Sequence, residues 1–477
     1  MDLSSLTKEE CFAKLDLEIS YLEKRLGALR NLRNSLPPIA SLPNEILSKI
    51  FLISHNLTIE EDPSGVVLEP QGWRGNTRLT LTWVSQHWRQ VSLSYPDLWT
   101  FVTNGHMEYI RTCLDRSKGH ELTAVLFAPL EKHTRACLSA MHRIRSLSVN
   151  VYDTPDREAV DPDYVWERQS APCLVCLSMV SIDILGQEGD AGTRFFSGVH
   201  PHLQHLTLSG CEYHWNSPLL SVSTLTTFRI IDPHTHLRVR DLMEYLRMMP
   251  SLVDCQIETE LEGAANPPHL EVSQQLYLPN LRTLTLQQKP MANVLSLLSQ
   301  LNIPNSSITT ESYVNSEEEL SHVFQLLEEY WSQTPYWRDE IIRHISVRRT
   351  KYANLVCISM EMPVEKDVRQ FAMNLQSYSL GHSVLLNISR HFSSRRCQPR
   401  SVSLTCVPRE AVYTFASLLS LRVLRLEKIE GLGDQDSMDC GPDNFFPQLK
   451  ELEVDGKRYH SFREYFGSLE DVDSRSE

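Results

Sequence analysis

The chain has 477 residues, of which 41% are hydrophobic and 22% charged, and its formal net charge is −14. This composition is ordinary for a globular protein of two or three folding units, and the negative charge argues against a nucleic-acid binder, which normally carries a basic face. The eleven cysteines show no regular spacing, so we expect no disulfide framework. Neither a signal sequence nor a run of about 18 apolar residues is evident. We therefore expect a cytoplasmic or nuclear protein that makes no contact with a membrane.

Residues 1–38 predict a short N-terminal helix with the seam of a coiled coil. Its large apolar residues alternate at steps of three and four, and they are Phe12, Leu15, Ile19, Leu22, Leu26, Leu29 and Leu36. Arg33 interrupts this seam, and Pro37-Pro38 ends the helix because neither proline can donate a backbone hydrogen bond. Such a helix either pairs with a second copy, which would give a homodimer, or folds back on the next module. The sequence leaves both open.

Residues 39–102 predict a small helical module. A helix begins at Leu42-Pro43, where proline suits the first turn and Ser41 is placed to cap. Its apolar residues recur at helical spacing, and they are Ile46, Leu47, Ile50 and Phe51. Several prolines and glycines between residues 60 and 76 then predict a loop. A further helix is expected from about Arg78 to Pro96.

Residues 103–465 repeat a pattern of proline or serine, then leucine, then alternating apolar and polar residues. This alternation predicts strands with one buried face, and it recurs at residues 144–149, 201–208, 225–230, 250–257, 279–286, 400–404, 420–426 and 447–454. The leucines at positions 203, 225, 252 and 281 are 22 to 29 residues apart, which is the length of one leucine-rich repeat. Helices are expected between strands, as at residues 240–249 and 294–298. Because one such unit cannot bury its own face, the pattern predicts an irregular leucine-rich-repeat solenoid and a mixed α/β fold overall.

The pattern is weakest in residues 305–400. There, residues 317–349 predict two longer helices joined near Pro335. Residues 466–477 form an acidic tail that we expect to be solvated.

The motifs carry no signature of catalysis. The sequence has no phosphate-binding glycine loop, no nucleophile elbow and no paired histidines at zincin spacing. Cys173 and Cys176 have redox spacing but lie in an apolar, strand-like run, and His202 and His205 would point to opposite faces of one strand. We therefore expect a protein that is not an enzyme, with no metal site and no cofactor.

Residues 42–99 resemble an F-box of the form common in large fungal families. The resemblance is carried by Leu42-Pro43-x-Glu45-Ile46-Leu47, Ile50-Phe51, Val84-Ser85-x-x-Trp88-Arg89 and Pro96-x-Leu98-Trp99. It departs from the family in the breaker-rich residues 60–76, where a short second helix is usual, and in Ser85, where cysteine is frequent. F-box modules are also known to precede leucine-rich repeats.

The resemblance implies a substrate-recognition adaptor of an SCF-type cullin–RING ubiquitin ligase. Such a protein docks on a Skp-family adaptor through the F-box and presents a protein substrate on the repeats. Carried over by position, the adaptor-binding residues would be Leu42, Pro43, Ile46, Leu47, Ile50, Phe51, Val84 and Trp88. The alternative is an F-box-like scaffold that no longer binds the ligase machinery.

Two basic clusters stand out in this acidic chain, one between residues 338 and 351 and one between residues 390 and 400. The second comprises Arg390, His391, Arg395, Arg396 and Arg400. Arginines bind carboxylates and phosphates through paired hydrogen bonds, so the four arginines of this cluster are candidate substrate-binding residues. The other interpretation is a solvated loop and helix face.

Overall fold

The computed structural model divides into two compact units, one of residues 1–178 with 198–202 and one of residues 179–197 with 203–477. It describes residues 7–57, 77–103, 107–127, 135–137, 139–151, 170–181, 200–210, 222–231, 237–259, 261–262, 275–288, 291–303, 306–313, 317–333, 344–349, 356–361, 371–377, 399–407, 412, 415, 418, 421–429, 446, 448–461, 464 and 465. Within these residues the fold is mixed α/β, as the sequence predicts, with strands that are mostly parallel.

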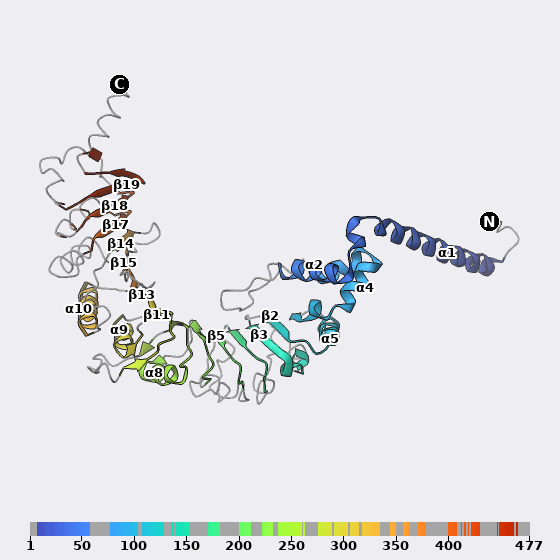
Figure 1. The fold of residues 1–477 in the computed structure, drawn as a ribbon, viewed down its shortest axis with the longest axis horizontal. Coiled ribbons are helices and arrows are strands. Elements are labelled where there is room, and N and C mark those ends of the chain that lie inside the picture. Colours follow the sequence, from blue (N-terminus) through green and yellow to red (C-terminus); the bar gives the residue numbers. More distant parts are fainter. Residues whose placement is uncertain are drawn as a thin grey trace, which may run out of the picture. The chain divides into compact units, whose positions relative to one another are not determined.

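The first unit begins with helices. They are α1 (Lys8–Ser35), η1 (Pro38–Ser41), α2 (Asn44–Asn56), α3 (Thr77–Val84), α4 (Gln86–Ser94) and η2 (Pro96–Trp99), several of which are labelled in Figure 1. A capping box starts α1, because the Thr7 hydroxyl accepts from the backbone N–H of Glu10 and the Glu10 carboxylate accepts from that of Thr7. The predicted helices of the N-terminal segment and of the next module are therefore present.

Two local predictions in this module are wrong. Ser41 does not cap α2, because it ends η1 and its hydroxyl donates to the Pro38 carbonyl at 2.7 Å. The single helix expected from Arg78 to Pro96 is two helices, α3 and α4, which meet at Ser85. The Ser85 side chain caps α4 by accepting from the backbone N–H of Trp88 at 3.1 Å, a preference of serine that competes with helix continuation.

Parallel strands complete the first unit. β1 (Phe101–Thr103) pairs with β2 (Leu122–Phe127), which pairs with β3 (Ile144–Val151); α5 (Met107–Arg116) lies between β1 and β2 in the chain. Arg143 donates to the Leu114 carbonyl at 2.7 Å and to the Ser117 hydroxyl at 3.0 Å, which ties the start of β3 to the end of α5. β4 (Cys176–Ser181) spans the division between the units.

A buried arginine joins these helices to these strands. Arg78, in α3, is 2% exposed. Its guanidinium donates to the carbonyl of Leu98 in η2 at 3.4 Å, to that of Phe101 in β1 at 2.5 Å and to the hydroxyl of Tyr109 in α5. The same group lies over the Phe101 and Tyr109 rings, at 5.7 and 5.4 Å from their centroids. One side chain thus fixes α3 against η2, β1 and α5.

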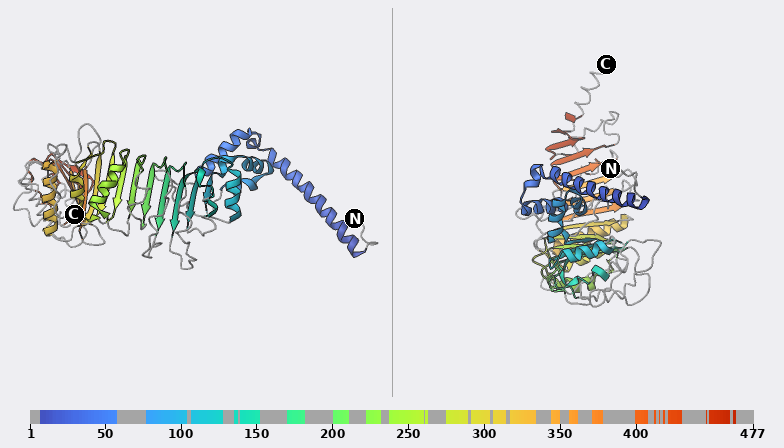
Figure 2. Two further views of the ribbon diagram at one scale, coloured as in Figure 1. Left: turned by 90° about the horizontal axis from the view of Figure 1, so that it is seen from below. Right: turned by 90° about the vertical axis from the view of Figure 1, so that its right-hand side faces the viewer.

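The second unit is built on a run of parallel strands in chain order. They are β5 (His205–Ser209), β6 (Thr227–Ile231), β8 (Asp254–Glu258), β11 (Thr283–Gln288) and β13 (Ser307–Tyr313). Figure 2 shows them side by side. The first four fall where the alternation predicts a strand, whereas β13 lies in the part of the chain where the pattern is weakest. The leucine that precedes each of the first four is buried, at 1% exposure or less: Leu203, Leu225, Leu252 and Leu281.

Helices and short strands connect these strands. They are β7 (Leu237–Arg238), α8 (Val239–Met248), β9 (Leu261–Glu262), β10 (Leu276–Tyr277), α9 (Met291–Ser299), β12 (Leu301–Asn302) and α10 (Glu317–Gln333). α9 contacts α8, α10, β11 and β13. The helices predicted at residues 240–249 and 294–298 are confirmed as α8 and part of α9.

The sheet of the second unit changes direction after β13. β16 (Phe371–Ser377) pairs parallel with β13, and β15 (Val356–Glu361) lies antiparallel between β16 and β14 (His344–Arg349). The prediction of two helices in residues 317–349 is therefore wrong in its second half. α10 forms the first helix, but His344–Arg349 is a strand, where Ile345 and Val347 alternate with polar residues. The apolar residues there recur with a period of two, which is the spacing of a strand. The basic residues between them are also compatible with the exposed face of a helix.

Parallel pairing then resumes through β17 (Ser401–Thr405), β18 (Val423–Glu427) and β19 (Glu451–Val454). β20 (Lys457–Tyr459) returns antiparallel to β19. The hairpin turns at Asp455 and Gly456, with φ of 48° and 81°, as a two-residue turn between twisted strands requires. The strands predicted at residues 400–404, 420–426 and 447–454 are confirmed.

We expect Arg78→Met to destabilise the first unit by about 2–4 kcal/mol. The substitution keeps an apolar stem but leaves the Leu98 and Phe101 carbonyls without their charged donor. A buried acceptor without a hydrogen-bond partner lowers the free energy of unfolding. Chemical denaturation followed by tryptophan fluorescence measures the loss. Arg89→Met, at an exposed arginine of α4, is the matched control. Equal stability of the two variants would show that the buried contacts contribute nothing.

Candidate functional site: an apolar surface on the helical module

α2 has two apolar faces on opposite sides of one helix. The first is buried and consists of Leu47, Phe51 and His55, with exposures of 0, 1 and 6%. The Phe51 ring packs on Trp88 of α4 with 4.8 Å between centroids, and the His55 ring packs edge-on against Phe101 of β1 at 5.8 Å. These contacts hold α2 to the rest of the module.

The second face of α2 consists of four large aliphatic side chains that remain exposed. Ile46, Ile50, Ile53 and Leu57 are 44, 39, 61 and 81% exposed. They follow one another at steps of four, three and four, so they form one stripe along the helix. We call these four residues the α2 stripe. Scattered exposed leucines are normal, but a contiguous apolar patch marks an interaction site.

The end of α3 adds two exposed apolar side chains. Trp83 is 72% exposed and Val84 is 51% exposed. The chain enters α4 directly after them, at the capped Ser85. Because α3 contacts both α2 and α4, these side chains belong to the same small module as the α2 stripe. A surface tryptophan of this exposure is unusual, because tryptophan is highly buried on average.

The predicted adaptor-binding residues are divided by the structure between the core and the surface. Ile46, Ile50 and Val84 are exposed, as is Pro43, and Leu42 is half-buried. By contrast, Leu47 and Phe51 face the interior of the module, and Trp88 is half-buried against Phe51. A partner that docks on this module would therefore meet the first group directly, and the second group would act by fixing the shape of α2.

Three exposed side chains were missed by the sequence interpretation: Ile53, Leu57 and Trp83. The signal for the first two was present, because they continue the helical spacing that begins at Ile46 and Ile50. The exposure of Trp83 could not be predicted from spacing, because it depends on where α3 ends.

Burial changes the electrostatics behind the α2 stripe. Removal from water, and secondarily the positive charge of Arg78, lower the pKa of His55 from 6.5 to about 3. His55 is therefore neutral at physiological pH. Burial also raises the pKa of the Cys113 thiol in α5, against the weaker opposing effect of Arg78, so this cysteine is a protonated core residue and not a nucleophile.

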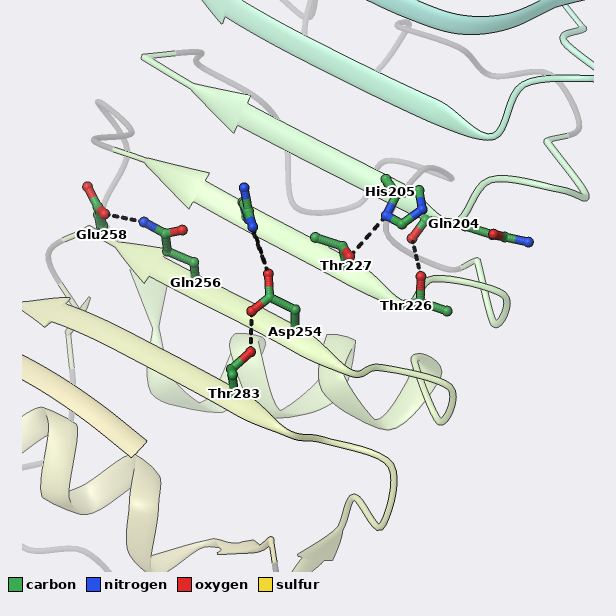
Figure 3. Close-up of polar contacts among 9 residues, drawn as sticks. Gln204, His205, Thr226, Thr227, Asp254, Gln256, Glu258 and Thr283 are labelled. Carbon is green, nitrogen blue, oxygen red and sulfur yellow. Dashed lines mark hydrogen bonds and ion pairs between the residues drawn. The ribbon is translucent and has the colours of Figure 1, made fainter. Parts of the chain in front are cut away.

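A second candidate surface lies in the other unit, on the polar side of its parallel strands (Figure 3). His205 of β5, Thr227 of β6, Asp254 of β8 and Thr283 of β11 occupy the same register position on adjacent strands. His205 Nδ1 lies 3.0 Å from the Thr227 hydroxyl, and the Asp254 carboxylate accepts from Thr283. Side chains from four adjacent strands thus form a polar row that contains two hydrogen-bonded pairs.

Arg229, two residues after Thr227 on the same side of β6, extends this polar row. Its guanidinium lies 3.0 Å from the Asp254 carboxylate, and the two side chains are 18 and 30% exposed. Further along β8, the Gln256 side-chain amide donates to the Glu258 carboxylate at 2.5 Å. The opposite side of the same strands is apolar and buried, with Leu206, Phe228, Cys255 and Leu284 in register.

The basic cluster predicted to bind substrate is described only in part. Arg390, Arg395 and Arg396 lie outside the described residues. Arg400 is exposed and immediately precedes β17, where its carbonyl accepts from the backbone N–H groups of Arg422 and Val423 at 2.8 and 3.1 Å. The cluster therefore stays a prediction.

The sequence also singled out a pair of cysteines and a pair of histidines. Cys173 and Cys176 are half-buried and unbridged. His202 precedes β5 and is exposed. Among the described residues, no group of three or more histidine, cysteine or acidic side chains is arranged to hold a metal ion. No helix in the described part of the chain combines the length and apolarity of a membrane span.

Comparison with known proteins gives no further assignment. No known protein family matches the sequence, and no characterised protein is similar to it.

We expect His55 to make the first unit less stable below neutral pH. The unfolded chain binds a proton at His55 with a pKa of 6.5, whereas the folded protein holds it neutral down to about 3. Between these values the unfolded state binds more protons, so the free energy of unfolding falls as pH falls, by up to about 1.4 kcal/mol per pH unit.

His55→Phe retains the ring that packs on Phe101 and removes the titrating group. From pH 7.0 to 5.5, denaturant unfolding should show wild type losing about 1 kcal/mol more than this variant. Equal losses in the two proteins would contradict a neutral, buried His55.

Proposed function

We propose that the chain is a substrate receptor of a cullin–RING ubiquitin ligase, which docks on a Skp-family adaptor through the helical module and binds a protein substrate with its second unit. The observation that carries the proposal is the α2 stripe. It lies on a helix that directly follows the Leu42-Pro43 motif, and the helix is anchored from its other face. A module that only stabilised its own chain would have no need of this second apolar face.

The size of the apolar surface supports docking. Burying a fully exposed large aliphatic or aromatic side chain contributes about 1.5–3 kcal/mol. The α2 stripe with Trp83 and Val84 is 39 to 81% exposed, so covering all six side chains would contribute on the order of 5–10 kcal/mol. This is similar to the estimated cost of association, about 4–15 kcal/mol. Each of the six side chains therefore matters, and adjacent contacts such as Leu42 and Pro43 would have to add to them.

The rigidity of the module also supports docking. The buried contacts of Phe51 with Trp88 and of Arg78 with its three acceptors fix α2 and α3 before any partner arrives. A surface that is already ordered loses less conformational entropy on binding than a flexible one. The proposed adaptor would thus meet a preformed apolar ridge.

The second unit is proposed to carry the substrate surface as an irregular leucine-rich-repeat solenoid. Its parallel strands follow the leucine pattern at repeat length. Their polar row offers hydrogen-bonding groups from several strands, of which Arg229 and Asp254 are half-buried and Thr283 is exposed. The class of substrate is a protein that presents polar side chains to this row.

Ile46→Asp combined with Ile50→Asp should abolish recovery of the Skp-family adaptor in a pull-down from cells, with a loss of affinity of at least about a hundredfold. Both positions are exposed, so the change places two carboxylates in the docking surface without disturbing the core, whereas Leu47→Asp would unfold the module. A charge that is buried without a partner is strongly unfavourable.

The matched control is Asn44→Asp combined with Asn56→Asp. It adds the same two carboxylates to exposed positions of α2 outside the stripe and should recover the adaptor normally. Equal recovery by both double variants would contradict docking through the α2 stripe. Failure of the unmutated chain to recover any adaptor would favour the scaffold alternative.

A further inference from the structure

α1 presents an apolar seam that no described residue covers. Its members are Phe12, Leu15, Ile19, Leu22, Leu26 and Leu29, which are between 40 and 67% exposed. Four of them, Ile19, Leu22, Leu26 and Leu29, form an open apolar surface that Glu23 and Arg25 flank. A side-chain hydrogen bond joins α1 to the helical module at the far end of the helix, from Asn31 to Gln86 at 2.9 Å.

The seam has the spacing of a coiled coil, so a helix of the same spacing is its natural occupant. Phe12, Ile19 and Leu26 alternate with Leu15, Leu22 and Leu29 at steps of three and four. Two copies of α1 would bring twelve such side chains together. We propose that the occupant is α1 of a second copy of this chain, running antiparallel.

Charge disfavours the parallel arrangement. In a parallel, in-register pair, the residues that directly precede Ile19 and Leu26 each face the residue five places later in the partner helix. Glu18 would then face Glu23 of the second copy, and Arg25 would face Arg30. Arg33, which lies in the seam, would meet its own equivalent. All three encounters bring like charges together.

Charge favours the antiparallel arrangement. The register that overlaps the whole seam places Ile19 of one copy opposite Leu22 of the other, with Phe12 opposite Leu29. Glu18 of each copy then flanks Arg25 of the other, giving two favourable pairs related by symmetry. On the other edge, Arg30 of each copy faces Glu9 of the other, which adds two favourable pairs, whereas Asp16 of each copy faces Glu23 of the other. Arg33 falls outside the six apolar layers.

Reversal of a single charge should have opposite effects on the stability of the parallel and the antiparallel dimer. In the antiparallel pair, Arg25→Glu turns both favourable pairs with Glu18 into repulsive ones, so the dimer should dissociate about tenfold more readily. In the parallel pair, the same change would place a carboxylate opposite Arg30 of the second copy and tighten the dimer. The residues three and four positions from Arg25 are uncharged, so the helix itself should be little affected.

The experiment is sedimentation equilibrium of the full-length chain at low salt. We expect a concentration-dependent dimer for wild type, weakening in Arg25→Glu, and recovery when Glu18→Arg is added to it. Lys24→Glu is the matched control, since it makes the same change of charge one residue away on the outer face and should leave dimerisation unchanged. Leu22→Asp should abolish the dimer, whereas Leu17→Asp, at an exposed leucine outside the seam, should not.

Three results would overturn the proposal. They are a chain that stays monomeric at every concentration, a dimer that Arg25→Glu tightens, and equal effects of Leu17→Asp and Leu22→Asp. None of these variants touches the α2 stripe, so the outcome is independent of adaptor binding.

Discussion

The buried guanidinium of Arg78 is the constraint on which the first unit depends. It satisfies the Leu98 and Phe101 carbonyls at the point where the helical module ends and the first strand begins, and it reaches the Tyr109 hydroxyl of α5. Its charge also helps to keep His55 neutral. Because His55 belongs to the buried face of α2, the orientation of this helix follows from the same cluster. The α2 stripe is exposed as a consequence.

The second unit depends on a different principle, the alternation of side chains along parallel strands. Successive register positions alternate between the two sides of the sheet. Leucine, phenylalanine or cysteine lies on the buried side, and threonine, aspartate or histidine lies on the other. Buried leucines before the strands fix where each strand begins. The result is a polar row whose side chains bond to one another across strands, as Asp254 does with Arg229 and Thr283. A partner for this row must compete with these internal bonds, which favours recognition by several weak polar contacts over one strong pair.

Much of the fold could be predicted because its periodicities are local. The strands from β5 to β11 and from β17 to β19 follow from alternation, and α1, α2 and α8 from helical spacing. The division of α2 into a buried and an exposed face could not be predicted in this way. Ile46 and Leu47 are adjacent, as are Ile50 and Phe51, so apolar residues occupy both sides of the helix. Contacts with Trp88 and Phe101, distant in sequence, decide which side is buried. The role of Arg78 was hidden for the same reason, because its acceptors lie 20 to 31 residues away.

We propose that the helical module docks on a Skp-family adaptor through the exposed face of α2 and the end of α3. Hydrogen–deuterium exchange of the full-length chain, with and without a purified Skp-family adaptor, tests it most directly. The account predicts that the adaptor slows exchange in residues 44–57 and 77–84, while β5, β6 and β8 exchange as before. Unchanged exchange in α2 and α3 at saturating adaptor, or slowing confined to the second unit, would contradict it.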